Sequence, residues 1–340
     1  MNRVLFWSSV ERLLRDGDPV FAALVVRHTL HSPGTTGARL IVSATGKVEG
    51  TIGGGSMEFE VVRRASQRLR HAGDFASEIQ HLYHRDRAPG ETSGMICAGE
   101  QINLYHIFQP DPDGETVGAI AAAACSDRHG IASFQAQGLS FTEDGVIPPG
   151  LQFRLSGAEG DSWAFEEQVM NLKRVVVMGG GHCGLALSRT LWQLGYEVFL
   201  FETRGDVDTF TGNTFARSKT VVPDYSEAAV RVRCPEETDA VVMTTDFPSD
   251  VAALKGLADA GGFRSVGLMG SPAKITRITR ELRESGVSED FIGSLRAPIG
   301  LPIHSNTPEE IAVSVAAEIV RDRNTEEVRR LGAVRLEDYG

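Results

Sequence analysis

The chain has 340 residues, of which 41% are hydrophobic and 23% are charged, and these fractions exclude a wholly disordered protein. The 34 lysines and arginines against 45 acidic residues give a formal net charge of −11. We therefore expect no nucleic-acid partner, because sequence-independent binding of nucleic acid needs a basic surface. The 37 glycines are clustered, which indicates loops where the backbone approaches another group closely.

Three further features concern the compartment. No apolar run reaches about 18 residues, so we expect no membrane insertion. The first 18 residues carry charges throughout and lack the apolar core of a signal peptide. The four cysteines are widely spaced and form no C-x-x-C pair, which argues against a zinc ribbon or a disulfide framework. These features predict a cytoplasmic protein, and we assign no residue to a metal site.

The first half of the chain mixes helical and strand patterns. We expect, in chain order, a helix at 3–16, strands at 19–28, 39–43 and around Val48, a helix at 57–71, strands within 75–108 around a loop at 94–99, and a buried helix at 116–125. The polar segment that follows this half predicts a linker.

The second half alternates strands and helices, which predicts a parallel sheet with helices on both faces. The expected strands are 174–178, 196–201, 219–222, 240–244 and 265–269, and the expected helices are 185–194, 251–260 and 273–285. The fold class is therefore α/β. We expect a mixed α+β domain over 1–155, a linker over 156–172, a Rossmann-like doubly wound domain over 173–330 and a tail over 331–340.

A glycine motif, Gly179-x-Gly181-x-x-Gly184, separates the first strand and helix of the second half. Its glycines permit a tight turn, close approach of a pyrophosphate and close helix–strand packing, and the helix start favours an anion. Glu202 ends the next strand, 18 residues after Gly184, where an acidic residue usually binds a ribose hydroxyl. His182 either contacts a ligand phosphate or caps the helix. The motif either binds a dinucleotide such as NAD(P) or only forms the turn.

A second glycine loop lies at 50–56. Gly53, Gly54 and Gly55 expose backbone N–H groups without side-chain obstruction, which suits an anion. Arg39 lies two strands away and is expected to point at the same ligand, because the arginine fork suits phosphate and oxyanions. Glu58 would interact with the start of the following helix. The other interpretation of this loop is a glycine-rich turn that is needed only for packing.

Cys97 stands beside small residues in the loop 94–99. An exposed thiol there would serve as a sulfur carrier or a soft metal ligand. Free cysteines are more often buried, so the residues alone favour a core position.

The order of these motifs resembles the XdhC/CoxI maturation factors of molybdenum hydroxylases such as xanthine dehydrogenase. The resemblance is carried by Ser32-Pro33, Gly37-Ala38-Arg39, Gly50-Thr51-Ile52-Gly53-Gly54-Gly55, Gly94-Met95-Ile96-Cys97-Ala98-Gly99, Gly179-Gly180-Gly181-His182, Gly267-Leu268-Met269-Gly270-Ser271, Ala297-Pro298-Ile299-Gly300-Leu301 and Thr307-Pro308-Glu309-Glu310-Ile311-Ala312. Two positions depart from the family pattern: Ser56 stands where many relatives have cysteine, and Ala98 replaces the first glycine of a Cys-Gly-Gly loop.

The resemblance implies a binding protein more than an enzyme. Family members accept molybdenum cofactor, which is molybdopterin or its dinucleotide form, and pass it to an apo-molybdenum hydroxylase after sulfuration with a cysteine desulfurase. They are typically homodimers. On this basis Cys97 would act on the metal or carry sulfur, and Gly270 and Ser271 would join the other candidate residues in binding cofactor. The alternative is an NAD(P)-dependent oxidoreductase that uses the Rossmann-like half.

Overall fold

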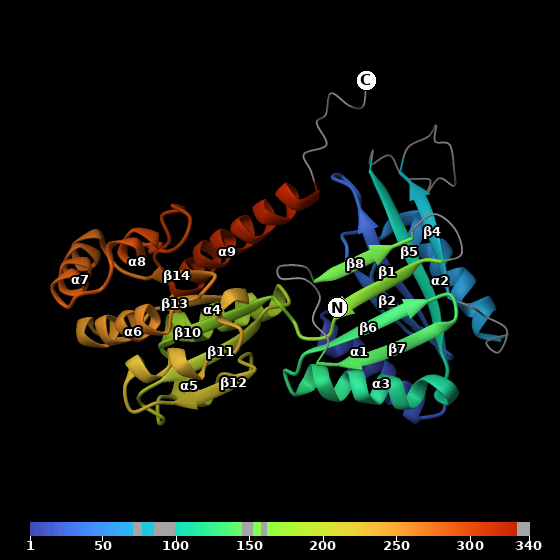
Figure 1. The fold of residues 1–340 in the computed structure, drawn as a ribbon, viewed down its shortest axis with the longest axis horizontal. Helices are drawn as coiled ribbons and strands as arrows, with labels where there is room; N and C mark the ends of the chain where they lie inside the picture. The colour runs from blue at the N-terminus through green and yellow to red at the C-terminus, as the bar shows by residue number, and fades with distance from the viewer. Residues whose placement is uncertain (71–76, 85–98, 145–151, 158–161, 332–340) are drawn as a thin grey trace, which may run out of the picture. The chain divides into compact units, whose positions relative to one another are not determined.

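The computed structural model describes residues 1–70, 77–84, 99–144, 152–157 and 162–331 (Figure 1). The chain forms two compact units that divide between Asn171 and Leu172. Each unit has its own buried apolar clusters. The α/β fold class is confirmed: antiparallel sheets build the first unit and a parallel sheet builds the second.

The first sheet of the N-terminal unit has the strand order β3-β2-β1-β5-β4, and all its neighbouring strands are antiparallel. Its strands are β1 (Val20–His28), β2 (Arg39–Ser43), β3 (Val48–Thr51), β4 (Glu78–Tyr83) and β5 (Glu100–Phe108). The apolar run of β1 is buried from Val20 to Val26, because side chains on both of its faces meet helices.

Three helices cover this sheet: α1 (Arg3–Arg15), α2 (Gly55–Arg68) and α3 (Pro110–Cys125). Alternate residues of β1 point to opposite faces. Ala22 and Leu24 join the cluster that contains α1 and α3, whereas Ala23 and Val25 join the cluster that contains α2. The helix expected at 3–16 is confirmed, and its apolar stripe is the face that meets the sheet.

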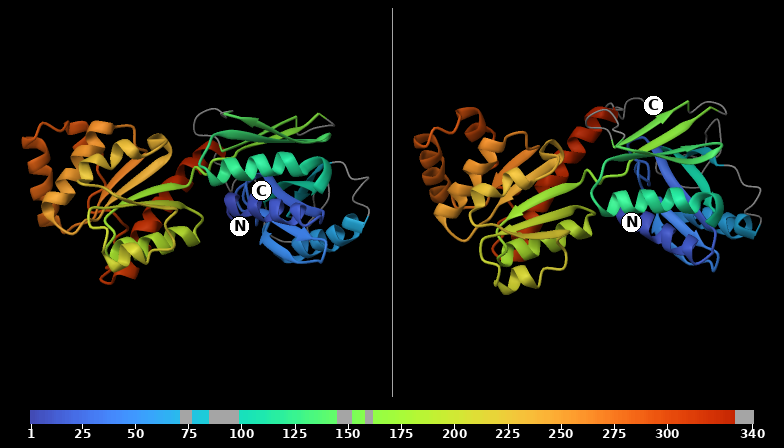
Figure 2. Two further views of the ribbon diagram at one scale, coloured as in Figure 1. Left: turned by 90° about the horizontal axis from the view of Figure 1, so that it is seen from below. Right: turned by 60° about the horizontal axis from the view of Figure 1, so that its bottom comes forward.

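A second antiparallel sheet, β7-β6-β9-β8, completes this unit beside α3 (Figure 2). Its strands are β6 (Gly130–Gln135), β7 (Gly138–Glu143), β8 (Phe153–Ser156) and β9 (Ala164–Gln168). The linker expected at 156–172 needs correction, because β9 lies within it and pairs with both β6 and β8. Glu167, one of the polar residues on which the linker prediction rested, points inward and is a buried, charge-paired glutamate.

The C-terminal unit is built on a parallel sheet with the order β12-β11-β10-β13-β14. Its strands are β10 (Arg174–Met178), β11 (Glu197–Glu202), β12 (Ser218–Val221), β13 (Thr238–Val242) and β14 (Ser265–Leu268). This is the doubly wound order, in which the chain runs to one side of β10 and then to the other. The point of reversal lies between β10 and β13.

Helices cover both faces of the parallel sheet, as Figure 1 shows. They are α4 (His182–Gln193), α5 (Asp208–Thr211), α6 (Phe247–Ala260), α7 (Pro272–Glu284), α8 (Glu289–Ser294) and α9 (Pro308–Leu331), with short 3-10 turns η2 (Tyr225–Glu227), η3 (Ala229–Arg231) and η4 (Pro235–Glu237). α4 and α9 pack with Val175 and Val177, and α6 and α7 pack with Val176 and Met178. Among the described residues, none of the helices is both long and apolar enough to cross a bilayer.

Candidate functional site

Three loops of the N-terminal unit meet at one end of the first sheet. Strand register places them together, since β1 and β5 are antiparallel neighbours and Arg39 of β2 pairs with Thr51 of β3. The loop after β1, the glycine loop after β3 and the start of β5 therefore emerge on the same side. These segments carry three of the motifs that the sequence singled out.

The backbones of these loops are in close contact. A Cβ on Gly34 would lie 2.2 Å from the Ile52 carbonyl oxygen, and one on Gly53 would lie 2.8 Å from the Gly34 nitrogen. A Cβ on Gly99 would lie 2.4 Å from the Ser32 nitrogen. No side chain fits at such distances, so the glycines at these three positions serve the approach of one loop to another.

A buried polar network holds these three loops together, and we call the three loops the loop assembly. Gln101 Oε1 accepts hydrogen bonds from Ser32 Oγ at 3.0 Å and from the Gly34 N–H at 3.2 Å, and it lies 3.1 Å from His84 Nε2. Gln101 Nε2 donates to the Ile52 carbonyl at 3.3 Å. Burial lowers the pKa of His84, so its ring is neutral near pH 7. The network was not evident from sequence, because its members are far apart along the chain.

Glu58 closes the glycine loop with its own carboxylate. Its Oε2 accepts from Thr51 Oγ1 at 2.6 Å, from the Ile52 N–H at 3.0 Å and from the Gly54 N–H at 3.1 Å. Part of the expected anion cradle is thus already occupied. The start of α2 stays open, since Gly55 and Ser56 are exposed and a Cβ on Gly54 would meet nothing within 4 Å.

Arg39 does not face this loop as a free cation, which corrects the expectation for it. The side chain is 2% exposed, and Arg39 Nη2 donates to Glu167 Oε2 at 3.0 Å while its guanidinium lies over the Phe6 ring. Arg3 lies 3.5 Å from the same carboxylate, and Trp7 Nε1 donates to it at 3.0 Å. The positive charge of Arg39 is therefore neutralised by Glu167, and this buried ion pair, together with Arg3, links α1, β2 and β9.

Cys97 and most of the loop 94–99 lie outside the described residues. The role expected for this thiol stays a prediction. The described neighbours on either side, His84 and Gly99, both belong to the loop assembly, and the His84 N–H donates to the Gly99 carbonyl at 3.0 Å.

The glycine motif of the C-terminal unit follows β10 and opens α4. A Cβ on Gly184 would lie 2.0 Å from the Gly179 carbonyl oxygen, and one on Gly179 would lie 2.4 Å from the Met243 carbonyl oxygen. Gly181 differs, because a Cβ there would meet nothing within 4 Å. His182 is exposed and is the first residue of α4, whose cap residue, Gly181, offers no side chain. The start of α4 is therefore an unobstructed site for an anion.

Glu202 ends β11 as expected, but its carboxylate is turned into the protein. It is 1% exposed, and its oxygens accept from the Gly180 N–H at 2.8 Å, the Thr203 N–H at 2.9 Å and the Arg204 N–H at 3.1 Å. Burial raises the pKa of Glu202, but these hydrogen bonds outweigh it and the pKa is lowered. Phe210 packs over Gly180, where a Cβ would lie 2.9 Å from Phe210 Cβ.

Gly270 and Ser271 follow β14 at the same edge of the sheet. Ser271 Oγ accepts from the Lys274 N–H at 3.3 Å and so caps α7. Next to them lies a charge pair that the sequence analysis did not identify. Lys274 Nζ binds Oδ2 of the buried Asp250, and Asp250 Oδ1 accepts from Thr244 Oγ1 at 2.5 Å. Thr244 Cα would lie 3.1 Å from a Cβ on Gly179, so this pair stands beside the glycine motif.

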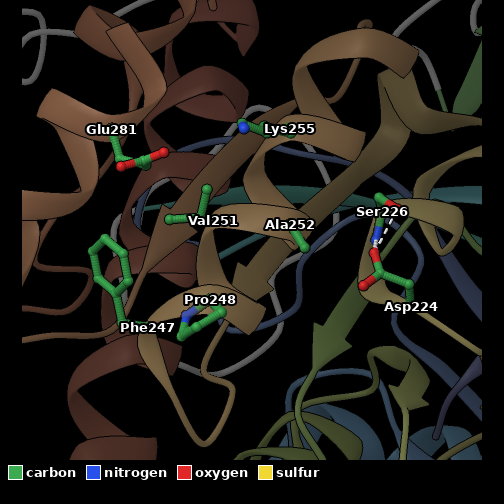
Figure 3. A pocket seen from close by; sticks show the side chains of 8 residues that line it. All are labelled: Asp224, Ser226, Phe247, Pro248, Val251, Ala252, Lys255 and Glu281. Carbon is green, nitrogen blue, oxygen red and sulfur yellow. Dashed lines mark hydrogen bonds between the residues drawn. The ribbon is translucent and has the colours of Figure 1, made fainter. Parts of the chain in front are cut away.

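A cavity of about 430 Å³ lies elsewhere in this unit, between η2, α6 and α7 (Figure 3). Its apolar lining comes from Phe247, Pro248, Val251 and Ala252, and its charged groups come from Asp224, Lys255 and Glu281. Asp224 is engaged locally, because Oδ1 accepts from the Ser226 N–H at 2.8 Å. None of the residues lining it was singled out by sequence analysis.

The structure defines a two-domain protein. A domain of antiparallel sheets, with three loops meeting at one end of its first sheet, precedes a Rossmann domain in which the start of α4 is open. Comparison with known families gives the same division. The model of the XdhC and CoxI family matches residues 13–77, and the model of the XdhC Rossmann domain matches residues 175–319. The chain belongs to the XdhC and CoxI family.

Two individual proteins are similar over most of the chain. YqeB of Escherichia coli K12, itself uncharacterized, is 25% identical over 287 residues, which are 84% of this chain and 40% of YqeB. The chain thus spans two fifths of the length of that relative. A crystal structure described as a xanthine dehydrogenase from Bacillus halodurans superposes with a TM-score of 0.71 at 17% identity and covers 96% of both chains. This second likeness shows a common fold.

Proposed function

We propose that this chain is a cytoplasmic maturation factor for a molybdenum hydroxylase such as xanthine dehydrogenase. In this role it binds molybdenum cofactor, supports its sulfuration and delivers it to the apo-hydroxylase. Family membership supports the proposal. The structural observation that carries it is the convergence of three family motifs, around Ser32-Pro33, Gly50–Gly55 and Gly99, at the open start of α2.

The residues of this chain suit the phosphate of the cargo at the start of α2. Gly55 and Ser56 are exposed at this helix start, and the positive end of the helix dipole favours an anion there. Arg39 has no part in this version of the site, because its charge is paired with Glu167. Cys97 is the proposed thiol that meets the metal or carries sulfur from a cysteine desulfurase, since a dithiolene-bound metal accepts soft sulfur ligands.

Cofactor retention tests the proposal directly. The purified full chain is mixed with molybdenum cofactor and passed through gel filtration, and pterin and molybdenum are measured in the protein peak. We expect both to be retained at a constant ratio to protein. Absence of both from the peak would refute the binding role.

Cysteine variants test the thiol separately. Cys97→Ala should reduce cofactor retention or the sulfuration of a client hydroxylase, whereas Cys125→Ala is a matched control because Cys125 is exposed on α3, away from the loop assembly. Equal behaviour of the two variants would remove Cys97 from the mechanism. We further propose a homodimer, for which the mass in solution is the check.

A second candidate function is an NAD(P)-dependent oxidoreductase. The observation that favours it is the Lys274–Asp250 pair beside the glycine motif, because a half-buried lysine paired with a buried carboxylate at the strand ends can donate a proton to a substrate. It predicts substrate-dependent consumption of NADPH or NADH by the purified chain. Lys274→Met should abolish that turnover, and turnover that survives the change would exclude this role for the pair.

A further inference from the structure

A hydrogen bond crosses the carboxyl edge of the parallel sheet at the glycine motif. Arg204 Nη2 donates to Thr245 Oγ1 at 2.7 Å. Met178 of β10 pairs with Phe201 on one side and Val242 on the other, and Arg204 and Thr245 each lie three residues beyond those partners. Gly181 lies three residues beyond Met178. The bond therefore joins the two loops that flank the open start of α4.

The Arg204 guanidinium is placed where ligands of this fold bind. In open parallel sheets the ligand occupies the crevice outside the carboxyl ends of the strands, where the strand order reverses. Here that point lies between β10 and β13, and Thr245 follows β13. The Arg204 side chain is 48% exposed, so its charge faces this crevice while Nε donates to Glu202 Oε1 at 3.3 Å.

Glu202 is unsuited to bind a ribose diol. A carboxylate offers about four lone-pair sites. Six donors use them: the N–H groups of Gly180, Thr203 and Arg204, the Thr203 hydroxyl, Arg204 Nε and the Tyr225 hydroxyl. A diol would have to displace one of these bonds inside a site that is closed to solvent. The acidic residue that commonly selects NAD is therefore structural here.

We propose that Arg204 is a phosphate-binding residue of a nucleotide site at this edge, and that the site prefers a ribose carrying a phosphomonoester over a free diol. Among nicotinamide nucleotides this means NADP over NAD. The pyrophosphate would lie at the start of α4 and the ribose phosphate against the Arg204 fork, which matches phosphate in geometry and charge. Thr245 holds the guanidinium across the crevice until phosphate replaces it. This inference concerns a second ligand and does not depend on molybdenum cofactor binding.

Calorimetry on the full chain with NADP and NAD tests the preference. We expect NADP to bind about tenfold or more tighter than NAD, since a charge-assisted hydrogen-bond pair contributes on this scale. Arg204→Gln should bring the two affinities to within about threefold of each other, mainly by weakening NADP. Equal binding by the unaltered chain, an unchanged ratio in Arg204→Gln or no binding of either nucleotide would overturn the proposal.

Three further variants keep the test specific. Arg204→Lys retains charge without the planar fork, so its NADP preference should fall between those of the unaltered chain and Arg204→Gln. Thr245→Val removes the hydrogen bond to Arg204 and should still bind NADP more tightly than NAD. A loss of this preference in Thr245→Val would count against the assignment of Arg204 to phosphate binding. Arg231→Gln is the matched control, because Arg231 is an exposed arginine of the same unit that pairs with Glu227. Its nucleotide ratio should not change.

Molybdenum cofactor retention by Arg204→Gln separates the two proposals. Retention at the unaltered level together with a lost NADP preference supports the assignment of Arg204 to a nucleotide site. A loss of cofactor retention with an intact NADP preference overturns it, because Arg204 then serves the cargo.

Discussion

At the scale of single residues, several side chains that look available for a ligand in the sequence are engaged by the protein itself. Arg39 neutralises Glu167, Glu58 accepts three hydrogen bonds from its own loop, and Glu202 bonds to the glycine motif. The common reason is burial: a charge removed from water needs a partner, and a loop of bare N–H groups needs an acceptor. Sequence proximity to a glycine loop therefore does not distinguish a ligand-binding charge from a structural one.

The buried cluster around Glu167 gives a first prediction. Glu167→Gln leaves Arg3 and Arg39 buried without a counter-charge, so unfolding of the N-terminal unit should become easier by about 3–5 kcal/mol. Denaturant titration measures this change. Glu166→Gln on the opposite face of β9 is the matched control, because Glu166 pairs at the surface with Arg154, and its effect should be small. Similar losses in both variants would contradict the assignment.

The same carboxylate makes a pH prediction. Burial raises the pKa of Glu167, but Arg39 and Arg3 outweigh it and lower the pKa below its ordinary value of 4.5. A lowered pKa in the folded state means that the stabilisation is complete above the ordinary value and is lost as the pH falls through the folded value. Acid titration of stability should show a drop below about pH 4.5. The Glu167→Gln variant should lack the part of this acid-induced loss of stability that comes from protonation of Glu167.

Glu58 makes a prediction about the N-terminal glycine loop. Glu58→Ala leaves the N–H groups of Ile52 and Gly54 without their acceptor, which should cost about 1–3 kcal/mol of stability. Because the vacated N–H groups favour an anion, added phosphate should raise the melting temperature of this variant more than that of the unaltered chain. Glu60→Ala on the exposed face of α2 is the control. An equal response to phosphate in all three proteins would refute the self-capped loop.

At the scale of elements, the glycine motif divides into glycines needed for packing and a glycine that leaves space. Gly179 and Gly184 bring β10, β13 and α4 into contact, whereas Gly181 faces open space at the helix start. The same motif thus builds the domain and presents the site. Its spacing is recognisable in sequence, but the assignment of each glycine to one role needs the neighbouring backbone.

This division predicts opposite results for two alanine variants. Gly184→Ala places a Cβ 2.0 Å from the Gly179 carbonyl, so α4 must shift and the C-terminal unit should lose about 1–3 kcal/mol. Gly181→Ala meets nothing within 4 Å, and Gly181 has a φ of −72°, which alanine accepts. The Gly181→Ala variant should therefore fold normally, but its added methyl group at the start of α4 should weaken nucleotide binding. Melting curves and calorimetry test both, and a stable Gly184→Ala would contradict the packing role.

At the scale of the whole molecule, the two units have separate apolar clusters and separate sheets. Residues 172–331 contain the parallel sheet and the helices on both its faces. We expect this segment to fold when it is produced alone, with a cooperative melting transition of its own. Circular dichroism and calorimetry test this, and a segment without a cooperative transition would show that the unit depends on the rest of the chain.

The sequence by itself determined the class of each unit. Alternating strands and helices with a glycine motif after the first strand predict a Rossmann domain, because parallel strands need crossover helices and the motif lies at a fixed point of that topology. The apolar run of β1 and the stripe of α1 were likewise evident, since local periodicity records which face is buried. By contrast, the polar and glycine residues around β9 predict a linker although Glu167 among them is buried, and the sequence does not predict the second antiparallel sheet.

Only the tertiary structure decided what the candidate residues do. It brought the loops at 32–34, 51–58 and 99–101 together through strand register, and it paired Arg39 with a glutamate 128 residues away. It also placed Arg204 and Thr245 on either side of the glycine motif. Each of these outcomes depends on which distant segments meet. The local sequence pattern does not indicate which distant segments meet. The partner of a buried charge or of an unbonded N–H group depends on how the whole unit packs.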